Sequence, residues 1–180
     1  GRCAESVEVC SSWRVCIEET DWIARRLAAG DRFGFVATSD SHRACPGMGG
    51  ALTGIYAPEL TPEALFDALR RGRTVATQGR RVLIDFRVDD LFVGEEGAAE
   101  PPVKLRLRVE APEEIEFAEV IRDGELLRRF DGDGPALEEA FEDAEVGAGP
   151  HSYYVRVKQC GEPSFNAPDQ PPEFYRAFII

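Results

Sequence analysis

The chain has 180 residues, of which 43% are hydrophobic and 30% are charged, so it can bury a sizeable core and wholesale disorder is excluded. Its 21 Lys and Arg residues are outnumbered by 33 Asp and Glu residues, and the net charge of −12 excludes a broad electrostatic grip on nucleic acid or anionic lipid. No stretch approaches the roughly 20 apolar residues of a membrane-spanning helix, and the N-terminus lacks the pattern of a signal peptide.

The acidic excess lies entirely in the second part of the chain. Residues 1–80 carry 10 basic and 10 acidic side chains, whereas residues 81–180 carry 11 and 23. This asymmetry predicts two differently built segments with a boundary near residue 80.

The five cysteines are odd in number and form no C-x-x-C pair, which favours a reducing, cytoplasmic compartment. A zinc knuckle from Cys3, Cys10 and Cys16 is a minor alternative, because their spacing does not match the close ligand pairs of structural zinc sites.

Strand and helix patterns alternate over the first segment. Alternating valines indicate a short strand at 5–11, and the N-cap residue Thr20 and the stop signal Gly30 predict a helix between them. The unbroken apolar run at 33–38 is typical of a strand buried on both faces of a parallel sheet. A helix that leads directly into such a strand is half of a β/α repeat.

The next elements are a loop, a brief strand and a helix. Residues 39–54 are polar and glycine-rich, which predicts a loop at the C-terminal end of the strand, where α/β folds place their chemistry. Residues 55–57 are expected to form a brief strand. Thr61 as N-cap, Pro62 at the first helical position and Gly72 after the last turn predict a second helix.

From about residue 80 the hydrophobic period changes to two, and Asp123-Gly124 is a hairpin-turn signal. The alternation predicts sheets that are buried on one face and solvated on the other, in an immunoglobulin-like or fibronectin-like β-sandwich over residues 81–180. The seven strand-length pieces are 81–88, 103–111, 115–123, 125–130, 136–143, 152–159 and 173–180.

Only two histidines are present, and they differ in context. His151 precedes a predicted strand and is interpreted as a turn residue. His42 follows Asp40 by two residues directly after the apolar run, so a carboxylate and an imidazole leave the same strand end. Such an Asp-x-His pair can bind Zn²⁺, Mn²⁺ or Fe²⁺, although the spacing alone favours hydrogen bonds from these side chains to the loop backbone.

Three consecutive stretches extend this pattern. They read DRFGFVATSDSHRACPGMGGALTG, IYAPELTPEALFDALRRGRTVATQG and RVLIDFRVDDLFVG. Together they resemble the C-terminal part of proteins with a PHP domain, the polymerase and histidinol phosphatase family of metal-dependent phosphoesterases. The likeness is closest to large bacterial members in which a helix and a β-sandwich follow the last barrel strand.

The resemblance implies a fold and a site. Residues 1–80 would be the C-terminal segment of a distorted seven-stranded (β/α) barrel, and residues 81–180 an accessory β-sandwich, giving an α/β plus all-β fold class. Asp40 and His42 would be ligands of a divalent Zn, Mn or Fe centre that activates water for phosphoester hydrolysis, and Arg43 would contact the phosphate of a small-molecule substrate. Thr38 stands where a glycine is common in the family.

The other metal ligands of the family are missing from this sequence. The family uses an early H-x-H motif, further histidines and a bridging glutamate, whereas no other histidine precedes residue 151. Two ligands cannot hold a catalytic metal, which needs three or more protein donors. We therefore expect a fragment that contributes an Asp-x-His half-site, binds metal only with the missing N-terminal barrel portion or another subunit, and is inactive alone.

Other types of functional site have weaker support in the sequence. Glu5, Glu8, Asp31 and Cys45 have no spacing that marks them as further ligands. Ser39, Asp40 and His42 are the residue types of a serine triad, but neighbours on one loop cannot align as one. The glycines of 46–54 lack the pattern of a phosphate-binding loop, and the acidic groups near residues 113–116 and 138–142 lack calcium-site spacing.

A function of another class also fits the sequence. The chain can be a non-catalytic binding or structural module, whose β-sandwich docks on a barrel, a partner subunit or a carbohydrate. Aromatic side chains at Tyr153, Tyr154, Phe174 and Tyr175 would then make the contact, unless they pack in the core.

Overall fold

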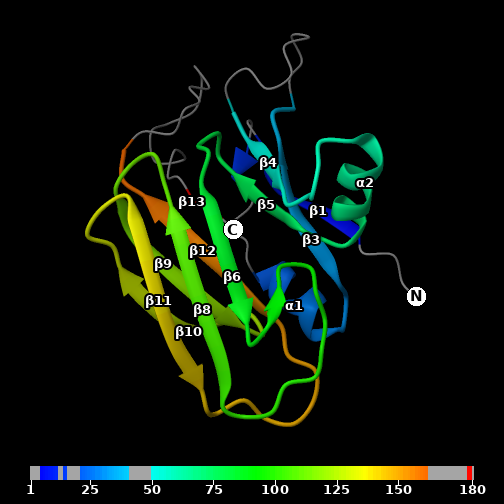
Figure 1. The fold of residues 1–180 in the computed structure, drawn as a ribbon, viewed down its shortest axis with the longest axis vertical. Helices are drawn as coiled ribbons and strands as arrows, with labels where there is room; N and C mark the ends of the chain where they lie inside the picture. Colours follow the sequence, from blue (N-terminus) through cyan, green and yellow to red (C-terminus); the bar gives the residue numbers. More distant parts are fainter. Residues whose placement is uncertain (1–4, 12–13, 16–20, 41–49, 162–177, 180) are drawn as a thin grey trace.

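The computed structural model describes residues 5–11, 14–15, 21–40, 50–161 and 178–179. They form two layers of antiparallel sheet with a smaller α/β part beside them (Figure 1). The elements of the α/β part are β1 (Glu5–Ser11), β2 (Arg14–Val15), α1 (Asp21–Ala28), β3 (Phe33–Thr38), β4 (Leu52–Ile55), α2 (Pro62–Arg70) and β5 (Thr74–Thr77). The remaining strands are β6 (Leu83–Val88), β7 (Leu91–Phe92), β8 (Val103–Glu110), β9 (Ile115–Arg122), β10 (Glu125–Asp131), β11 (Ala136–Asp143), β12 (Tyr153–Gln159) and β13 (Phe178–Ile179).

The first three predicted elements form one β-α-β unit. β1 and β3 pair in parallel, from Glu5 opposite Phe33 to Ser11 opposite Thr38, and α1 connects them. β2 pairs antiparallel with the other edge of β1. The strands predicted at 5–11 and 33–38 and the helix between Thr20 and Gly30 are therefore confirmed, and β1 supplies the second strand of the predicted half repeat.

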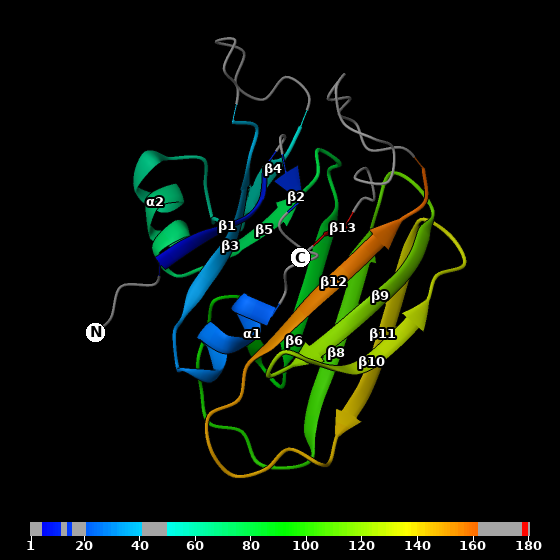
Figure 2. The ribbon, with the colours of Figure 1, turned by 180° about the vertical axis from the view of Figure 1, so that it is seen from behind.

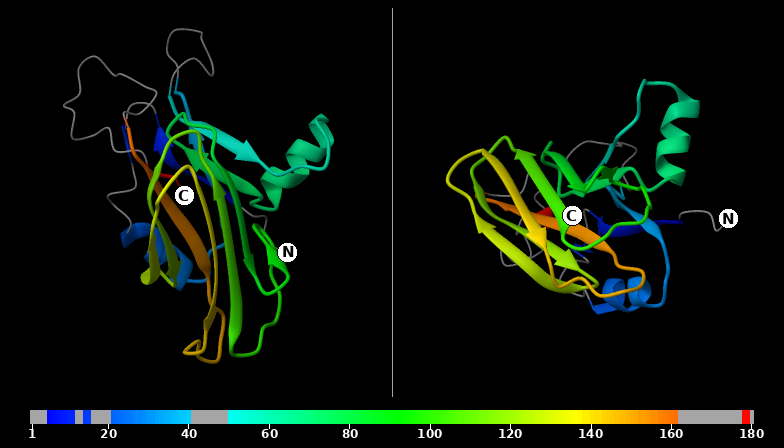
Figure 3. Two further views of the ribbon diagram at one scale, coloured as in Figure 1. Left: turned by 60° about the vertical axis from the view of Figure 1, so that its left-hand side comes forward. Right: turned by 60° about the horizontal axis from the view of Figure 1, so that its bottom comes forward.

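The second predicted helix is confirmed as α2, whose N-cap Thr61 accepts a hydrogen bond from the Ala64 backbone N–H. Gly72 follows the helix with a φ of +69°, a left-handed conformation that glycine adopts without strain. α2 projects from the end of the β4–β5 pair, away from the two antiparallel sheets (Figure 3).

The strand expected at 55–57 lies three residues earlier, as β4. Leu52 to Ile55 pair antiparallel with β5, so part of the glycine-rich segment is strand rather than loop. β5, whose four residues are all buried, was not predicted from the sequence. Its short run of threonine, valine and alanine carries no periodicity, and only pairing with β4 gives it strand geometry.

The second part of the chain forms two four-stranded antiparallel sheets. Their strand orders are β11-β8-β6-β7 and β10-β9-β12-β13. Buried side chains of both sheets share one core that includes Phe86, Leu105, Leu107, Val120 and Val157. On β8 buried and exposed residues alternate strictly, as predicted for a sheet with one solvated face. The described part of the predicted strand 173–180 is β13 alone.

β9 departs from that prediction because both of its faces are covered. Five consecutive residues, 117–121, are buried. The outer face of its sheet packs on the α/β part in a second core, where Ile121 and Tyr154 contact the cluster of Val9 and Ile23. Figure 2, seen from behind, shows α1 against β12 in this region.

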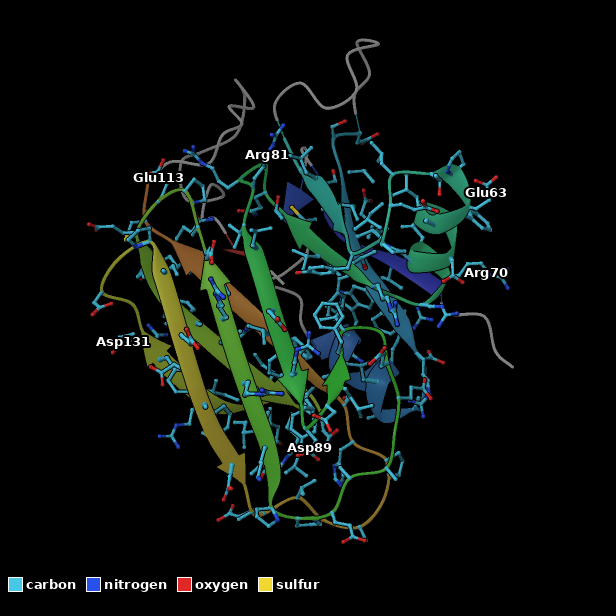
Figure 4. All side chains as sticks on the ribbon, viewed as in Figure 1. Glu63, Arg70, Arg81, Asp89, Glu113 and Asp131 are labelled. Carbon is cyan, nitrogen blue, oxygen red and sulfur yellow. The ribbon has the colours of Figure 1, made fainter. Side chains whose placement is uncertain are left out.

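Contacts also cross the predicted boundary at residue 80. Val75 of β5 belongs to the core of the two sheets, and the Tyr56 hydroxyl donates a hydrogen bond to the Ile84 carbonyl. Side chains fill the space between the two parts, and Arg81 and Asp89 mark the two ends of β6 (Figure 4). The division into segments 1–80 and 81–180 stays a prediction, as does the relation of the two sheets to the immunoglobulin fold.

The described residues form no closed barrel. Within the described ranges, the parallel strands β1 and β3 with α1 between them form the β/α unit. None of the helices in the described ranges is long and apolar enough to cross a membrane.

Candidate functional site

The predicted half-site begins at the C-terminal edge of the β1–β3 pair. Parallel pairing brings the C-terminal ends of both strands to one edge, with Ser11 opposite Thr38. Asp40 follows β3 by two residues, is exposed, and has a φ of +43°. Aspartate adopts this left-handed conformation more readily than most residues.

Two side-chain contacts fix the end of β3. The Thr38 hydroxyl donates a hydrogen bond to the Glu8 carboxylate on β1. On the other edge of β3, the Thr53 hydroxyl of β4 accepts a hydrogen bond from the Ala37 N–H at 2.9 Å and donates one to the Ala37 carbonyl at 2.7 Å. The strand that leads into Asp40 is therefore held on both sides.

The other predicted residues of the site lie outside the described part of the chain. His42, Arg43 and Cys45 fall within 41–49, so the structure places Asp40 alone of the predicted half-site. Of the further carboxylates considered, Glu8 lies on β1 and contacts Thr38 near the same edge.

Two further residues considered as ligands are at the opposite end of the strands. Glu5 pairs with Phe33, and Asp31 accepts a hydrogen bond from Arg26 Nε at 2.8 Å. The two ends of β3, Phe33 and Thr38, are roughly 17 Å apart at about 3.3 Å per strand residue, and Asp40 follows Thr38. Neither Glu5 nor Asp31 can join Asp40 in one metal site without a large rearrangement.

The described residues do not by themselves fit a catalytic metal. Among them, no group of three or more His, Cys, Asp or Glu side chains could hold a metal ion. The same holds for the acidic groups weighed as calcium sites: Glu113 pairs with Arg80 and Glu116 pairs with Lys158. Of the cysteines weighed as a zinc knuckle, Cys10 is buried, and Cys3 and Cys16 lie outside the described ranges.

His151 and Asp123 form a hydrogen-bonded pair, here called the clasp, between the β9–β10 turn and the segment before β12. The Nδ1 of His151 lies 2.6 Å from Asp123 Oδ2 and its Nε2 lies 3.1 Å from the Gly147 carbonyl oxygen. The hydrogen bond with Asp123 raises the pKa of His151 above 6.5, against a smaller opposing effect of burial. The same aspartate accepts a hydrogen bond from the Ser152 N–H at 2.8 Å. The interpretation of His151 as a turn residue agrees with these contacts.

A polar cluster around the buried Asp143 lies between the two sheets and was not predicted from the sequence. Arg122 on β9 donates to both carboxylate oxygens of Asp143 on β11, at 2.8 and 2.7 Å, and the Tyr153 hydroxyl donates to Asp143 at 2.9 Å. Burial raises the pKa of Asp143, but these hydrogen bonds together hold it below its ordinary value. An Asp at the end of an alternating strand carries no sequence signal for such a cluster.

The aromatic residues proposed as a contact surface do not form one within the described ranges. Tyr154 is buried, and its ring centroid lies 5.6 Å from that of Phe35. Tyr153 is half-buried, and its hydroxyl donates a hydrogen bond to Asp143. Phe174 and Tyr175 lie outside the described residues. Tyr154 therefore serves the packing of the two parts, which corrects the surface interpretation.

The segment that contains α1, β3, β4 and α2 matches a known protein family. Residues 21–74 match the PHP-associated family. The PHP-associated match contains the Asp40 motif and both helices, and it confirms the resemblance to the C-terminal part of a PHP-domain protein. The match ends at the first residue of β5, so the two antiparallel sheets lie outside the PHP-associated segment.

Two curated bacterial proteins are similar to the chain. They come from Chlamydia muridarum and Chlamydia trachomatis and are 27% and 26% identical to it over 158 residues. Each alignment covers 71% of this chain and 25% of the relative. Both relatives are described as "uncharacterized protein". The chain thus spans about a quarter of the length of these relatives, and no solved structure matches it.

Proposed function

We propose that the chain is the C-terminal segment of a PHP-like metal-dependent phosphoesterase. The observation that carries the proposal is the position of the Asp40 motif. It follows a parallel strand of a β-α-β unit, inside the segment that matches the PHP-associated family. The larger size of the chlamydial relatives supports a longer protein that supplies the rest of the barrel.

Asp40 and His42 are proposed as two ligands of a divalent Zn, Mn or Fe ion, and Arg43 as a contact to the phosphate of a small-molecule phosphoester. When bound, such a metal supplies the Lewis acidity that phosphoester hydrolysis by water requires. Asp40 is held in place by β3, which Glu8 and Thr53 fix on its two edges. The remaining ligands come from the N-terminal barrel portion or another subunit, so the 180-residue chain alone is proposed to be inactive.

The two antiparallel sheets are proposed to be an immunoglobulin-like accessory β-sandwich. The strand orders support this, because two sheets of four strands share one core with their inner faces. In this proposal the sandwich supports the barrel segment through α1, which packs on its outer face.

The test compares metal content and turnover in the longer protein and in the isolated chain. Elemental analysis and hydrolysis of p-nitrophenyl phosphate are measured for Asp40→Asn and His42→Ala. The matched controls are Asp90→Asn, which changes an exposed turn carboxylate, and His151→Ala, which changes the only other histidine. Loss of bound metal and at least a hundredfold drop in turnover are expected for the first pair alone.

Full metal content and turnover in both site variants would contradict the proposal. The alternative, a non-catalytic binding or structural module, predicts neither metal nor hydrolysis in the longer protein. In that case the two-sheet part would be tested for binding to a partner subunit or a carbohydrate.

A further inference from the structure

A cleft of about 860 Å³ lies where the α/β part meets the two antiparallel sheets. Its lining comes from the beginnings of β3 and β5, from β6, β7 and the segment that follows β7, and from the segment before β12 with the start of that strand. This volume is within the range of small-molecule sites, which form preferentially between packed parts of a chain.

The cleft contains a buried polar group without a partner. Thr74, at the start of β5, is 3% exposed, and its hydroxyl has no hydrogen-bond partner in the structure. Thr74 lines the cleft, next to Gly34 of β3. A Cβ at Gly34 would lie 2.6 Å from the Gly72 Cα and 2.8 Å from the Thr74 hydroxyl, so only glycine fits at this position. Burial of a hydroxyl without a partner costs stability, and a bound ligand can supply the missing hydrogen bond.

The charges around the cleft cancel. Three arginines, three acidic residues and one histidine line it: Asp31, Arg32, Arg70, Arg71, Glu95, Glu96 and His151. The carboxylate of Asp123, 2.6 Å from His151, balances the charge of the protonated imidazole. Arg32 forms an ion pair with Glu96 at 3.1 Å, and Arg71 forms one with Asp67 at 2.7 Å. A site for phosphate or another anion would carry a cationic excess. The balance favours an uncharged ligand.

Apolar side chains supply somewhat more of the cleft surface than polar groups do. Phe33 and Phe35 of β3 and Leu91 and Phe92 of β7 are half-buried and line it. Their aromatic and aliphatic surfaces can bury an apolar ligand body. A few polar groups in a mostly apolar cavity are the usual composition of a small-molecule site.

The cleft is separate from the proposed metal half-site. It lies at the Phe33 end of β3, whereas Asp40 lies beyond the other end of the strand. Ligand binding in the cleft is therefore independent of the proposed phosphoesterase function.

We propose that this cleft binds an uncharged, largely apolar organic molecule that forms a hydrogen bond with the Thr74 hydroxyl. The ligand would join the α/β part to the two sheets at a point remote from Asp40. It would therefore stabilise the contact between them.

The first experiment titrates the 180-residue chain with Nile red, an uncharged aromatic dye with a carbonyl acceptor whose fluorescence rises in apolar surroundings. We expect saturable binding of one dye per chain. Ala99→Trp places an indole in the cleft from an exposed lining position and should weaken binding at least tenfold. Gly147→Trp is a second filling variant, because a Cβ there meets nothing within 4 Å.

Two matched variants control for surface binding. Ala140→Trp adds the same indole at an exposed position of β11, outside the cleft. Phe66→Ser removes an aromatic ring that is 63% exposed on α2. Both should leave dye binding within twofold of the unmodified chain.

Thr74→Val tests the hydrogen bond because it keeps the shape of the side chain and removes the hydroxyl. Dye binding should weaken about three- to tenfold, while the melting temperature stays equal or rises, since an unpartnered buried hydroxyl is lost. Circular dichroism verifies that each variant is folded. Absence of saturable binding, or binding that neither filling variant weakens, would overturn the proposal. Unchanged binding in Thr74→Val would overturn the role of the hydroxyl.

Discussion

Arg122 on β9 and Asp143 on β11 form an ion pair that joins the two antiparallel sheets, in which the Arg122 Nη1 lies 2.8 and 2.7 Å from the two carboxylate oxygens of Asp143. The Asp143 side chain is 2% exposed and that of Arg122 is 25% exposed. A charged pair in this position costs desolvation energy, which its hydrogen bonds offset only while both partners are present.

Asp143→Asn should therefore destabilise the chain. The free energy of unfolding should fall by about 2 to 3 kcal/mol, near the low end for a broken buried pair, because Arg122 keeps some contact with water. Urea denaturation measures the change. Glu142→Gln, an exposed neighbour on the same strand, is the control and should change stability by less than about 0.5 kcal/mol. An equal loss in both variants would contradict the role of the ion pair.

The clasp between His151 and Asp123 should make stability depend on pH. Because the pKa of His151 is raised in the folded chain, its stabilising effect is complete below the ordinary value of 6.5. The effect is lost as the pH rises through the folded-state pKa. NMR titration of the His151 ring measures that pKa directly.

Denaturation of the chain and of His151→Gln between pH 5 and 9 gives the matching stability test. The difference in unfolding free energy should be largest at pH 5 to 6 and shrink as the pH rises. A difference that grows with pH would show that the charged imidazole is not the stabilising form. Asp123→Asn should return the pKa of His151 towards 6.5.

Gly124 in the β9–β10 turn should not tolerate alanine. It has a φ of +88°, and a Cβ there would lie 2.3 Å from the Cβ of Ala24 on α1. Gly124→Ala should lower the free energy of unfolding by about 1 to 3 kcal/mol through strain and displacement of α1. Gly134→Ala is the control, because its Cβ would meet nothing within 4 Å. Thermal melting of both variants compares the two positions, and equal melting temperatures would refute the close contact with α1.

Thr53→Val should weaken the link between β3 and β4. The valine keeps the side-chain shape but leaves the N–H and carbonyl of Ala37 without the Thr53 hydroxyl. We expect a loss of about 1 to 3 kcal/mol, and faster amide exchange at Ala37. Hydrogen exchange followed by NMR measures the second effect. Unchanged exchange at Ala37 would mean that water replaces the hydroxyl at no cost.

The local sequence predicted most elements because their signals are short-range. Thr61 and Pro62 determine where α2 begins, and the Asp123-Gly124 turn has both residues at positive φ, as a tight hairpin turn requires. The candidate site was predictable only to the extent of a motif: the structure places Asp40 after β3, and His42 stays a prediction. The resemblance to PHP-domain proteins, which the family match at 21–74 confirms, came from the same residues.

Local sequence patterns predicted both helices and most of the strands of the described residues, and they show a change of hydrophobic period at about residue 80. Capping residues and hydrophobic period are properties of neighbouring residues, so they can be recognised before the fold is known. Tertiary structure alone decided that β5 is a strand, that both faces of β9 are buried, and that Arg122 binds Asp143. Each of these depends on segments that are distant in the chain, because pairing, burial and charge compensation arise only when the fold brings those segments together.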